Sequence, residues 1–175
     1  MRVLVIAEHD NAALKPSTLN TISAAKKLTD DVDLIICGFE CDNVATEAAG
    51  IDALTNVHVC NSEYLKYQLS EDVTQIVVSN AKNYSHLLAP ATTFGKNLMP
   101  RISALLDAQQ ISDIIEVIDE CTFKRPIYAG SCIATVKSND EIKVITIRAT
   151  AFDPCANEGG NCLLYTSDAA DEPVC

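Results

Sequence analysis

The residues YSHLLAPATTFGKNLMPRISALLD, Tyr84–Asp107, decide the fold that we expect for this chain. His86–Ala89 is a short apolar run, which indicates a strand buried in a sheet, and Gly95–Ala108 has the apolar spacing of an amphipathic helix. A threonine-rich turn joins the two, with Thr93 as an N-cap and Pro100 as an early-helix proline. A buried strand that leads through a short turn into a helix is the building unit of α/β proteins.

The same unit recurs along the chain up to Ile118. The other expected strands are Arg2–Ala7, Val32–Cys37, Val57–Cys60 and Ile111–Ile118, and the other expected helices are Ser17–Leu28, Asn43–Ala49 and Ser70–Ala81. Ser17 is a candidate N-cap, and Gly50 is a candidate helix-ending glycine in the left-handed conformation. Because strands alternate with helices, we predict an α/β three-layer sandwich with a mostly parallel, five-stranded sheet.

Beyond Glu120 the pattern changes to two strand-like runs, Phe123–Lys137 and Lys143–Thr150. The residues between them, Ser138–Glu141, have the composition of a turn, so we expect a C-terminal antiparallel hairpin. Within the first run the alternation of side chains slips by one residue at Gly130, which indicates a β-bulge.

The residues after Phe152 follow neither pattern. They contain two adjacent glycines and no periodicity, and from about Cys162 they resemble a translated adapter read-through. We therefore predict one α/β domain over residues 1–152, followed by the start of a linker and a non-native, disordered tail over residues 153–175.

The composition argues against several classes of function. The chain carries 13 basic and 24 acidic residues, and its net charge of −11 repels phosphate backbones and anionic lipid heads, so we expect no nucleic-acid partner. No apolar run approaches the ~18 residues of a membrane span, so we expect no membrane insertion. The start, MRVLVIAEHD, does not have the pattern of a secretory signal. The eight cysteines form no C-x-x-C pair and the three histidines are scattered, so we predict neither a metal site nor a catalytic thiol.

Ala91–Asn97 contains the candidate ligand-binding residues. Backbone N–H groups at a helix start bind anions, and the hydroxyls of Thr92 or Thr93 and the ammonium of Lys96 would add contacts. The segment lacks the second glycine and the lysine–hydroxyl pair of a phosphate-binding loop. The same residues also suit a structural role, in which Thr93 caps the helix and Gly95 allows close packing.

Other polar groups suit structural roles as well as chemistry. Glu8-His9-Asp10 follows the first strand, where a dinucleotide-binding fold would require G-x-G-x-x-G, and no nucleophile accompanies it in sequence. The remaining groups fit solvated strand ends: the acidic residues Asp113, Glu116, Asp119 and Glu120, and the basic pair Lys124-Arg125. We predict no catalytic residues.

At several of these segments the chain resembles one known family, the electron transfer flavoprotein α-subunit, in its N-terminal domain. The resemblance is carried by MRVLVIAEH, LLAPATTFGKNLMPRISALLD, ISDIIEV, FKRPIYAGSCIATVKS and VITIRATAFDP, in the order of the family, over about residues 1–155. One departure is Ser131, which stands where the family usually has asparagine.

The resemblance implies an electron carrier rather than an enzyme. Such proteins pair an α- with a β-subunit, take electrons from acyl-CoA and related dehydrogenases, and pass them to a quinone oxidoreductase, in the bacterial cytoplasm or the mitochondrial matrix. The resemblance also implies a nucleotide-α-hydrolase-like domain that acts as scaffold and subunit interface. It places FAD in a C-terminal domain whose motifs are absent here, so we expect a fragment that carries no FAD. The alternatives are a nucleotide-binding module that uses the Thr92–Lys96 turn, and a stand-alone hydrolase.

Overall fold

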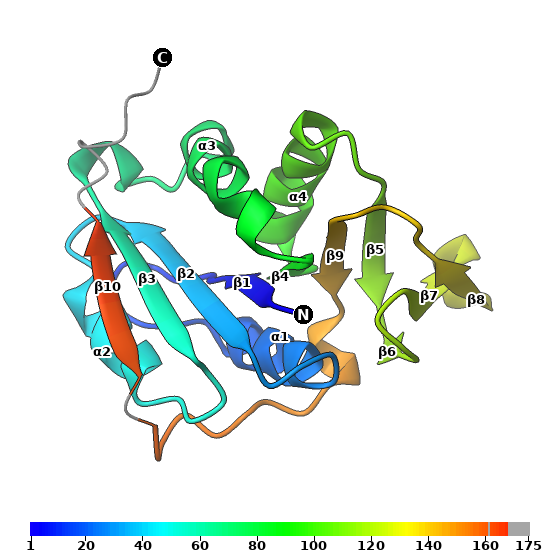
Figure 1. Ribbon diagram of the computed structural model, residues 1–175, viewed down its shortest axis with the longest axis horizontal. Helices are drawn as coiled ribbons and strands as arrows, with labels where there is room; N and C mark the ends of the chain where they lie inside the picture. Colours follow the sequence, from blue (N-terminus) through cyan, green and yellow to red (C-terminus); the bar gives the residue numbers. More distant parts are fainter. Residues whose placement is uncertain (161, 168–175) are drawn as a thin grey trace.

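A parallel sheet of seven strands runs through the computed structural model, which describes residues 1–160 and 162–167 (Figure 1). The strands lie in the order β10-β3-β2-β1-β4-β9-β5, and every neighbouring pair is parallel. Their bounds are β1 (Val3–Ile6), β2 (Val32–Gly38), β3 (Asn56–Asn61), β4 (His86–Pro90), β5 (Gln110–Ile114), β9 (Lys143–Ile147) and β10 (Leu163–Ser167).

Helices cover both faces of this sheet, with α1 (Pro16–Lys26) and α2 (Asp42–Ala49) on one and α3 (Ser70–Asn80) and α4 (Thr93–Leu105) on the other (Figure 1). Short 3₁₀ turns are η1 (Glu63–Leu65), η2 (Ala81–Asn83), η3 (Tyr128–Gly130) and η4 (Ala149–Ala151). The predicted α/β three-layer sandwich is therefore confirmed.

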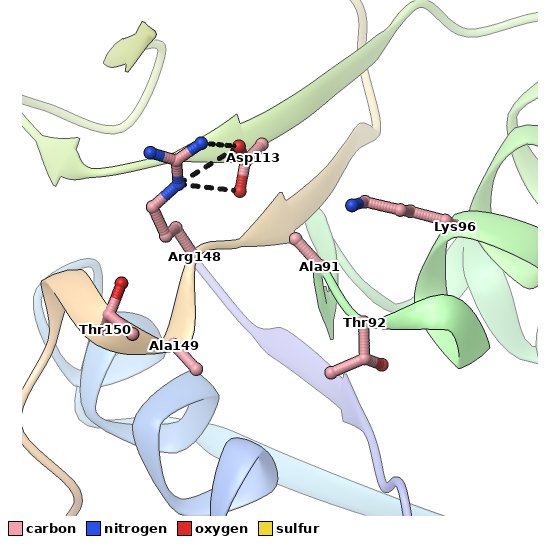
Figure 2. A pocket seen from close by; sticks show the side chains of 7 residues that line it. All are labelled: Ala91, Thr92, Lys96, Asp113, Arg148, Ala149 and Thr150. Atoms are coloured by element: carbon pink, nitrogen blue, oxygen red, sulfur yellow. Dashed lines mark hydrogen bonds and ion pairs between the residues drawn. The ribbon is translucent and has the colours of Figure 1, made fainter. Parts of the chain in front are cut away.

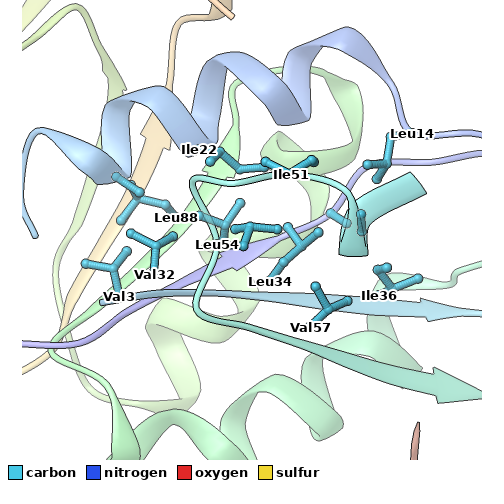
Figure 3. Close-up of a cluster of buried hydrophobic side chains, with 14 of the residues drawn as sticks. Val3, Leu14, Ile22, Val32, Leu34, Ile36, Ile51, Leu54, Val57 and Leu88 are labelled. Carbon is cyan, nitrogen blue, oxygen red and sulfur yellow. The ribbon is translucent and has the colours of Figure 1, made fainter. Parts of the chain in front are cut away.

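The central strands create two apolar cores because they are apolar on both sides. Every residue of β1 and β2 is buried, and successive side chains of a strand point to opposite faces. The core under α1 and α2 includes Val3, Val5, Ile22, Leu34, Ile36, Val57 and Leu88 (Figure 3). The core under α3 and α4 includes Leu4, Ile6, Val73, Val77, Leu87, Leu98 and Met99.

β9 is the main departure from the predicted topology. The sequence pattern predicts it as the second strand of a C-terminal hairpin, but it pairs in parallel with β4 on one side and β5 on the other. Val144, Ile145 and Ile147 are fully buried, because an apolar run of this kind is stable where both faces of a sheet are covered. The predicted sheet was thus too small, and the predicted turn at Ser138–Glu141 was wrong.

The antiparallel hairpin consists instead of β7 (Thr122–Ile127) and β8 (Cys132–Lys137), which belong with β6 (Glu116–Val117) to a separate sheet. Tyr128, Ala129 and Gly130 have φ angles of 49°, 54° and 91°, and this left-handed run reverses the chain at η3. The change of phase at Gly130 marks the hairpin turn, so the predicted β-bulge was wrong.

The predicted strand Ile111–Ile118 is divided between the two sheets. At Asp113 the φ angle is 60°, and the pairing of β5 with β9 shifts register between Ile111 and Ile114. The chain then leaves the main sheet and forms β6, β7 and β8, which project at one end of the molecule (Figure 1). We call residues 116–137 the arm.

Helix boundaries agree with the predictions to within a few residues, but the caps differ. Lys15 rather than Ser17 precedes α1, and Thr92 rather than Thr93 precedes α4. Pro100 lies in the middle of α4 rather than in its first turn. Gly50 follows α2 with φ −76°, so it does not adopt the left-handed conformation.

The segment after Phe152 runs back along the α1–α2 side of the molecule, and Leu163–Ser167 pairs in parallel with β3 as β10. These five residues fall within the range expected as a disordered tail, and the structure gives them a strand instead. The remainder of that expectation, for residue 161 and residues 168–175, lies outside the described residues.

Candidate functional site

The carboxyl ends of β1 and β4 form the switch point of the sheet. The chain leaves β1 toward α1 on one face, and it leaves the neighbouring β4 toward α4 on the other (Figure 1). Open α/β sheets bind their ligands in the crevice that such a divergence creates. This edge is therefore where a ligand site is expected.

Glu8 lies at this switch point and bridges the two diverging connections. Its Oε2 accepts hydrogen bonds from Ser17 Oγ at 2.7 Å and from Thr92 Oγ1 at 2.9 Å. Ser17 belongs to the first turn of α1 and Thr92 is the N-cap of α4, so one carboxylate ties together the starts of both helices. The backbone of Glu8 is also fixed, because its N–H and its carbonyl both bond the hydroxyl of Thr18.

The other members of the Glu8-His9-Asp10 group are directed elsewhere. His9 Nε2 lies 3.1 Å from the carbonyl oxygen of Cys37, and its Nδ1 accepts the backbone N–H of Asn11. Burial lowers the pKa of His9, although the Cys37 carbonyl and Asp10 oppose this shift. Asp10 accepts hydrogen bonds from the turn that follows it and from the ammonium of Lys15. The three side chains therefore share no reaction centre.

A pocket of about 320 Å³ lies beside this point, between the ends of β4, β9 and β5 (Figure 2). β4 and β9 are neighbouring strands, and the chain leaves them toward opposite faces of the sheet. Their carboxyl ends therefore form a second switch point. The pocket is lined by Ala91, Thr92, Lys96, Asp113, Arg148, Ala149 and Thr150.

An ion pair neutralises one side of the pocket. Arg148 Nε lies 3.1 Å from each carboxylate oxygen of Asp113, and Arg148 Nη2 also bonds Asp113 (Figure 2). The hydrogen bonds that Arg148 donates to the Asp113 carboxylate raise the pKa of the Arg148 guanidinium. Lys96 stands on the opposite wall, exposed to solvent, as the second cation of the pocket (Figure 2).

The structure separates the predicted anion-binding residues by role. Thr92 and Lys96 line the pocket, whereas Thr93 and Gly95 do not. Gly95 is buried at the first turn of α4, and a Cβ there would lie 1.9 Å from the carbonyl oxygen of Pro90. Its packing role rests on this contact. Whether Thr92, Thr93, Gly95 and Lys96 hold an anion stays a prediction.

Sequence reasoning missed two contributors to this edge. Arg148 was not singled out because the pattern placed its strand in a hairpin, far from Lys96. Ser17 was interpreted as a helix cap, but its hydroxyl donates a hydrogen bond to the carboxylate of Glu8. A basic residue directly after the apolar run of β9 was the signal that could have identified Arg148, because such a position falls at the carboxyl edge once the run is recognised as a parallel strand.

Several of the remaining charged candidates have structural partners. Asp119 accepts the N–H of Cys121 in a turn, and Glu116 pairs with Lys124 at 2.8 Å across the arm. By contrast, the Nε of Arg125 is buried and finds no hydrogen-bond partner among the residues that the structure describes. Among residues 1–160 and 162–167, no group of three or more His, Cys, Asp or Glu side chains is placed to hold a metal ion. Within the same residues, no helix is long and apolar enough to cross a membrane.

An α/β sandwich with a charged carboxyl edge and a projecting antiparallel arm defines the class of this protein, and comparison with known sequences defines the family. Residues 3–171 match the family described as "Electron transfer flavoprotein domain". The chain therefore belongs to the electron transfer flavoprotein family, whose members are electron carriers rather than enzymes.

Similar proteins come from bacteria and from mitochondria. The electron transfer flavoprotein subunit alpha of Pseudomonas aeruginosa is 51% identical over 161 residues, which cover 92% of this chain and 52% of that protein. The mitochondrial subunit alpha of Dictyostelium discoideum is 44% identical over 94% of this chain and 49% of its own length. The subunit alpha of Paracoccus denitrificans is 41% identical over 99% of this chain and 56% of its own length. The chain thus spans about half the length of these relatives.

The family name implies a flavin, and the residues at the carboxyl edge do not fit a flavin bound as a dinucleotide. A dinucleotide site in this fold class places a diphosphate against a glycine-rich first turn, but the turn after β1 is Glu8-His9-Asp10-Asn11. The carboxylate of Glu8 already bonds the hydroxyls at the two helix starts, where it would repel a diphosphate.

Proposed function

We propose that this chain is the N-terminal scaffold domain of an electron transfer flavoprotein α-subunit. In this proposal the complete subunit pairs with a β-subunit, accepts electrons from acyl-CoA and related dehydrogenases, and passes them to a quinone oxidoreductase. FAD belongs to the part of the subunit that corresponds to the other half of its relatives. The observation that carries the proposal is the 51% identity to an α-subunit over 92% of this chain.

The arm supports the role of a subunit interface. Phe123 fixes it to the domain, since this side chain is fully buried and contacts the ring of His86 edge to face. Tyr128 and Ile133, by contrast, are 79% and 54% exposed. In the part of the chain that the structure describes, the outer edge of β8 pairs with no strand. Exposed apolar side chains beside an unpaired strand edge favour contact with another chain.

A binding experiment tests the interface. Purified chain is titrated with the β-subunit of a related electron transfer flavoprotein, and Tyr128→Ser should weaken binding at least about tenfold. Tyr67→Ser is the matched control, because Tyr67 is 77% exposed but lies outside the arm. The assignment of the arm would be contradicted if both variants lost affinity for the β-subunit equally, or if neither variant lost affinity.

A spectroscopic experiment tests the electron-carrier role. The α-subunit that continues beyond this domain, produced with its β-subunit, should hold flavin and be bleached by an acyl-CoA dehydrogenase with its substrate. The present chain should be colourless when purified alone. Stoichiometric flavin absorbance on this chain alone would refute the scaffold assignment.

A further inference from the structure

The Glu8 carboxylate lies at the carboxyl edge of the sheet, beside the crevice in which open α/β folds bind their ligands. It accepts hydroxyl hydrogen bonds from the first turn of α1 and from the N-cap of α4, at 2.7 and 2.9 Å. Both partners stand at helix N-termini, where unsatisfied N–H groups and the helix dipole favour negative charge. Two helix starts and two hydroxyls thus converge on one side chain of the chain itself.

These donors are the kind that bind phosphate groups in other proteins. A phosphate at a helix N-terminus is held by backbone N–H groups and by nearby hydroxyl and ammonium groups. At this edge Thr92 supplies a hydroxyl and Lys96, one turn further into α4, supplies an ammonium. The difference is that the negative charge comes from Glu8, and a second anion there would be repelled by the carboxylate.

We propose that Glu8 is the built-in anion of this switch point and sets its ligand specificity. It satisfies the hydroxyls of Ser17 and Thr92, holds the β1–α1 and β4–α4 connections together, and excludes inorganic phosphate and phosphate esters from the crevice. The inference goes beyond the scaffold role, because it names the residue that separates this domain from a phosphate-binding one. It predicts that removal of one side chain converts the crevice into an oxyanion site.

The experiment uses the chain labelled with ¹⁵N and titrated with sodium phosphate against sodium chloride of equal ionic strength. In the unmodified chain, the amide signals of Thr92 and Thr93 should not respond to phosphate beyond the chloride control. In Glu8→Ala these signals should shift and saturate, with phosphate affinity at least about tenfold above that of the unmodified chain. Addition of Thr92→Val to Glu8→Ala should remove the gain.

Two variants separate the carboxylate of Glu8 from other effects. Glu47→Ala is the matched control, because Glu47 is another half-buried carboxylate that bonds the β1–α1 connection, through the N–H of Leu14 at 2.9 Å. It should gain no phosphate binding. Glu8→Ser retains a hydroxyl for its neighbours and replaces Glu8→Ala if that variant fails to fold.

The proposal is overturned if the unmodified chain binds phosphate at Thr92 as tightly as the Glu8 variants do. It is equally overturned if a folded Glu8→Ala or Glu8→Ser gains no phosphate binding, or if Glu47→Ala gains as much. Flavin on the isolated chain would refute the scaffold role by colour alone, so the two failures are distinguishable.

Discussion

Gly95 is required at the start of α4 for a reason that a single methyl group can test. Its Cβ would lie 1.9 Å from the Pro90 carbonyl oxygen, which belongs to the backbone of β4 and cannot move aside cheaply. We expect Gly95→Ala to lower the free energy of unfolding by about 3 kcal/mol, measured by urea denaturation. Gly50→Ala is the control, since its nearest contact is 3.3 Å and its φ is ordinary. It should change stability by less than about 1 kcal/mol, and similar losses in both variants would contradict the contact argument.

Asp33 is a buried carboxylate at the amino-terminal side of the sheet. It accepts hydrogen bonds from Tyr84 Oη at 2.7 Å and Asn56 Nδ2 at 2.8 Å, and it pairs with Arg2 Nη2 at 2.7 Å. His58 Nε2 lies 3.2 Å away. Burial raises the pKa of Asp33, but these hydrogen bonds and the charge of Arg2 outweigh burial, so the pKa is lowered overall.

This lowered pKa predicts a pH-dependent stability. Because the folded-state pKa lies below the unfolded value of about 3.9, the contribution of Asp33 is present above that pH and is lost as pH falls through the folded-state pKa. Asp33→Asn should cost about 2 kcal/mol at pH 7, with the partly exposed Arg2 limiting the loss. The difference from the unmodified chain should shrink below about pH 4 in urea unfolding. Asp31→Asn is the control, because Asp31 is an exposed partner of Arg2, and it should have little effect on stability. If the stability difference between Asp33→Asn and the unmodified chain stayed constant with pH, the assignment would be contradicted.

At the scale of elements, sequence patterns identified strands well and their neighbours poorly. The runs that form β1, β2 and β4 are buried throughout and, apart from Asp33 and His86, apolar, which is what a strand covered on both faces requires. β9 has the same continuous character, KVITI, whereas β7 and β8 do not. This difference between β9 and the arm strands was the signal that β9 belongs to the parallel sheet. Local alternation does not reveal which strands become neighbours, because pairing is set by crossovers across the whole chain.

The junction between the main sheet and the arm offers a prediction about one element. Asp113 has a left-handed φ of 60° near the end of β5, and Arg148, directly after β9, donates hydrogen bonds to its carboxylate. Since the pair is partly exposed, Arg148→Met should cost only about 1 kcal/mol in global stability. The N–H groups of Ile115 and Ile118 donate hydrogen bonds to carbonyl oxygens of β7. Hydrogen exchange at these two amides should nevertheless accelerate.

The control for this prediction is Lys26→Met, which breaks an exposed ion pair between Lys26, the last residue of α1, and Asp30, both outside the arm. It should leave exchange in the arm unchanged. If Arg148→Met alters exchange equally in the arm and in β1, the ion pair acts on the whole domain rather than on the junction.

The candidate site shows why function was harder to predict than fold. Thr92 and Lys96 were identified because they follow a strand in sequence. The residues that determine their surroundings, Glu8 and Arg148, follow strands that are far away in the chain. Their convergence depends on β1 and β9 being the two neighbours of β4. The pairing of β9 was not predicted, so the pocket could not be assembled from the sequence.

At the scale of the molecule, the residues that follow Phe152 determine where the folded domain ends. Asn20 Nδ2 donates to the Phe152 carbonyl at 2.6 Å, the Cys155 N–H donates to Leu19, and the Gly160 N–H donates to Gly50 at 2.8 Å. A Cβ at Gly160 would lie 2.5 Å from the backbone of Ile51. These contacts hold residues 152–160 against α1 and α2. Beyond them, the side chains of residues 163–166 are exposed, with Leu163 at 64% and Tyr165 at 51%.

Two truncations test this boundary, one ending at residue 160 and one ending at residue 152. Removal of β10 exposes the edge of β3 but little apolar surface, so the chain of residues 1–160 should lose less than about 2 kcal/mol of unfolding free energy in urea. The chain of residues 1–152 also loses the hydrogen bonds to α1 and α2, and it should be less stable than the longer truncation by at least about 1 kcal/mol. Equal stability of the two truncations would place the end of the domain at 152, as the sequence pattern predicts. If both truncations are unfolded, β10 is essential to the fold, because its loss is the change that the two truncations share.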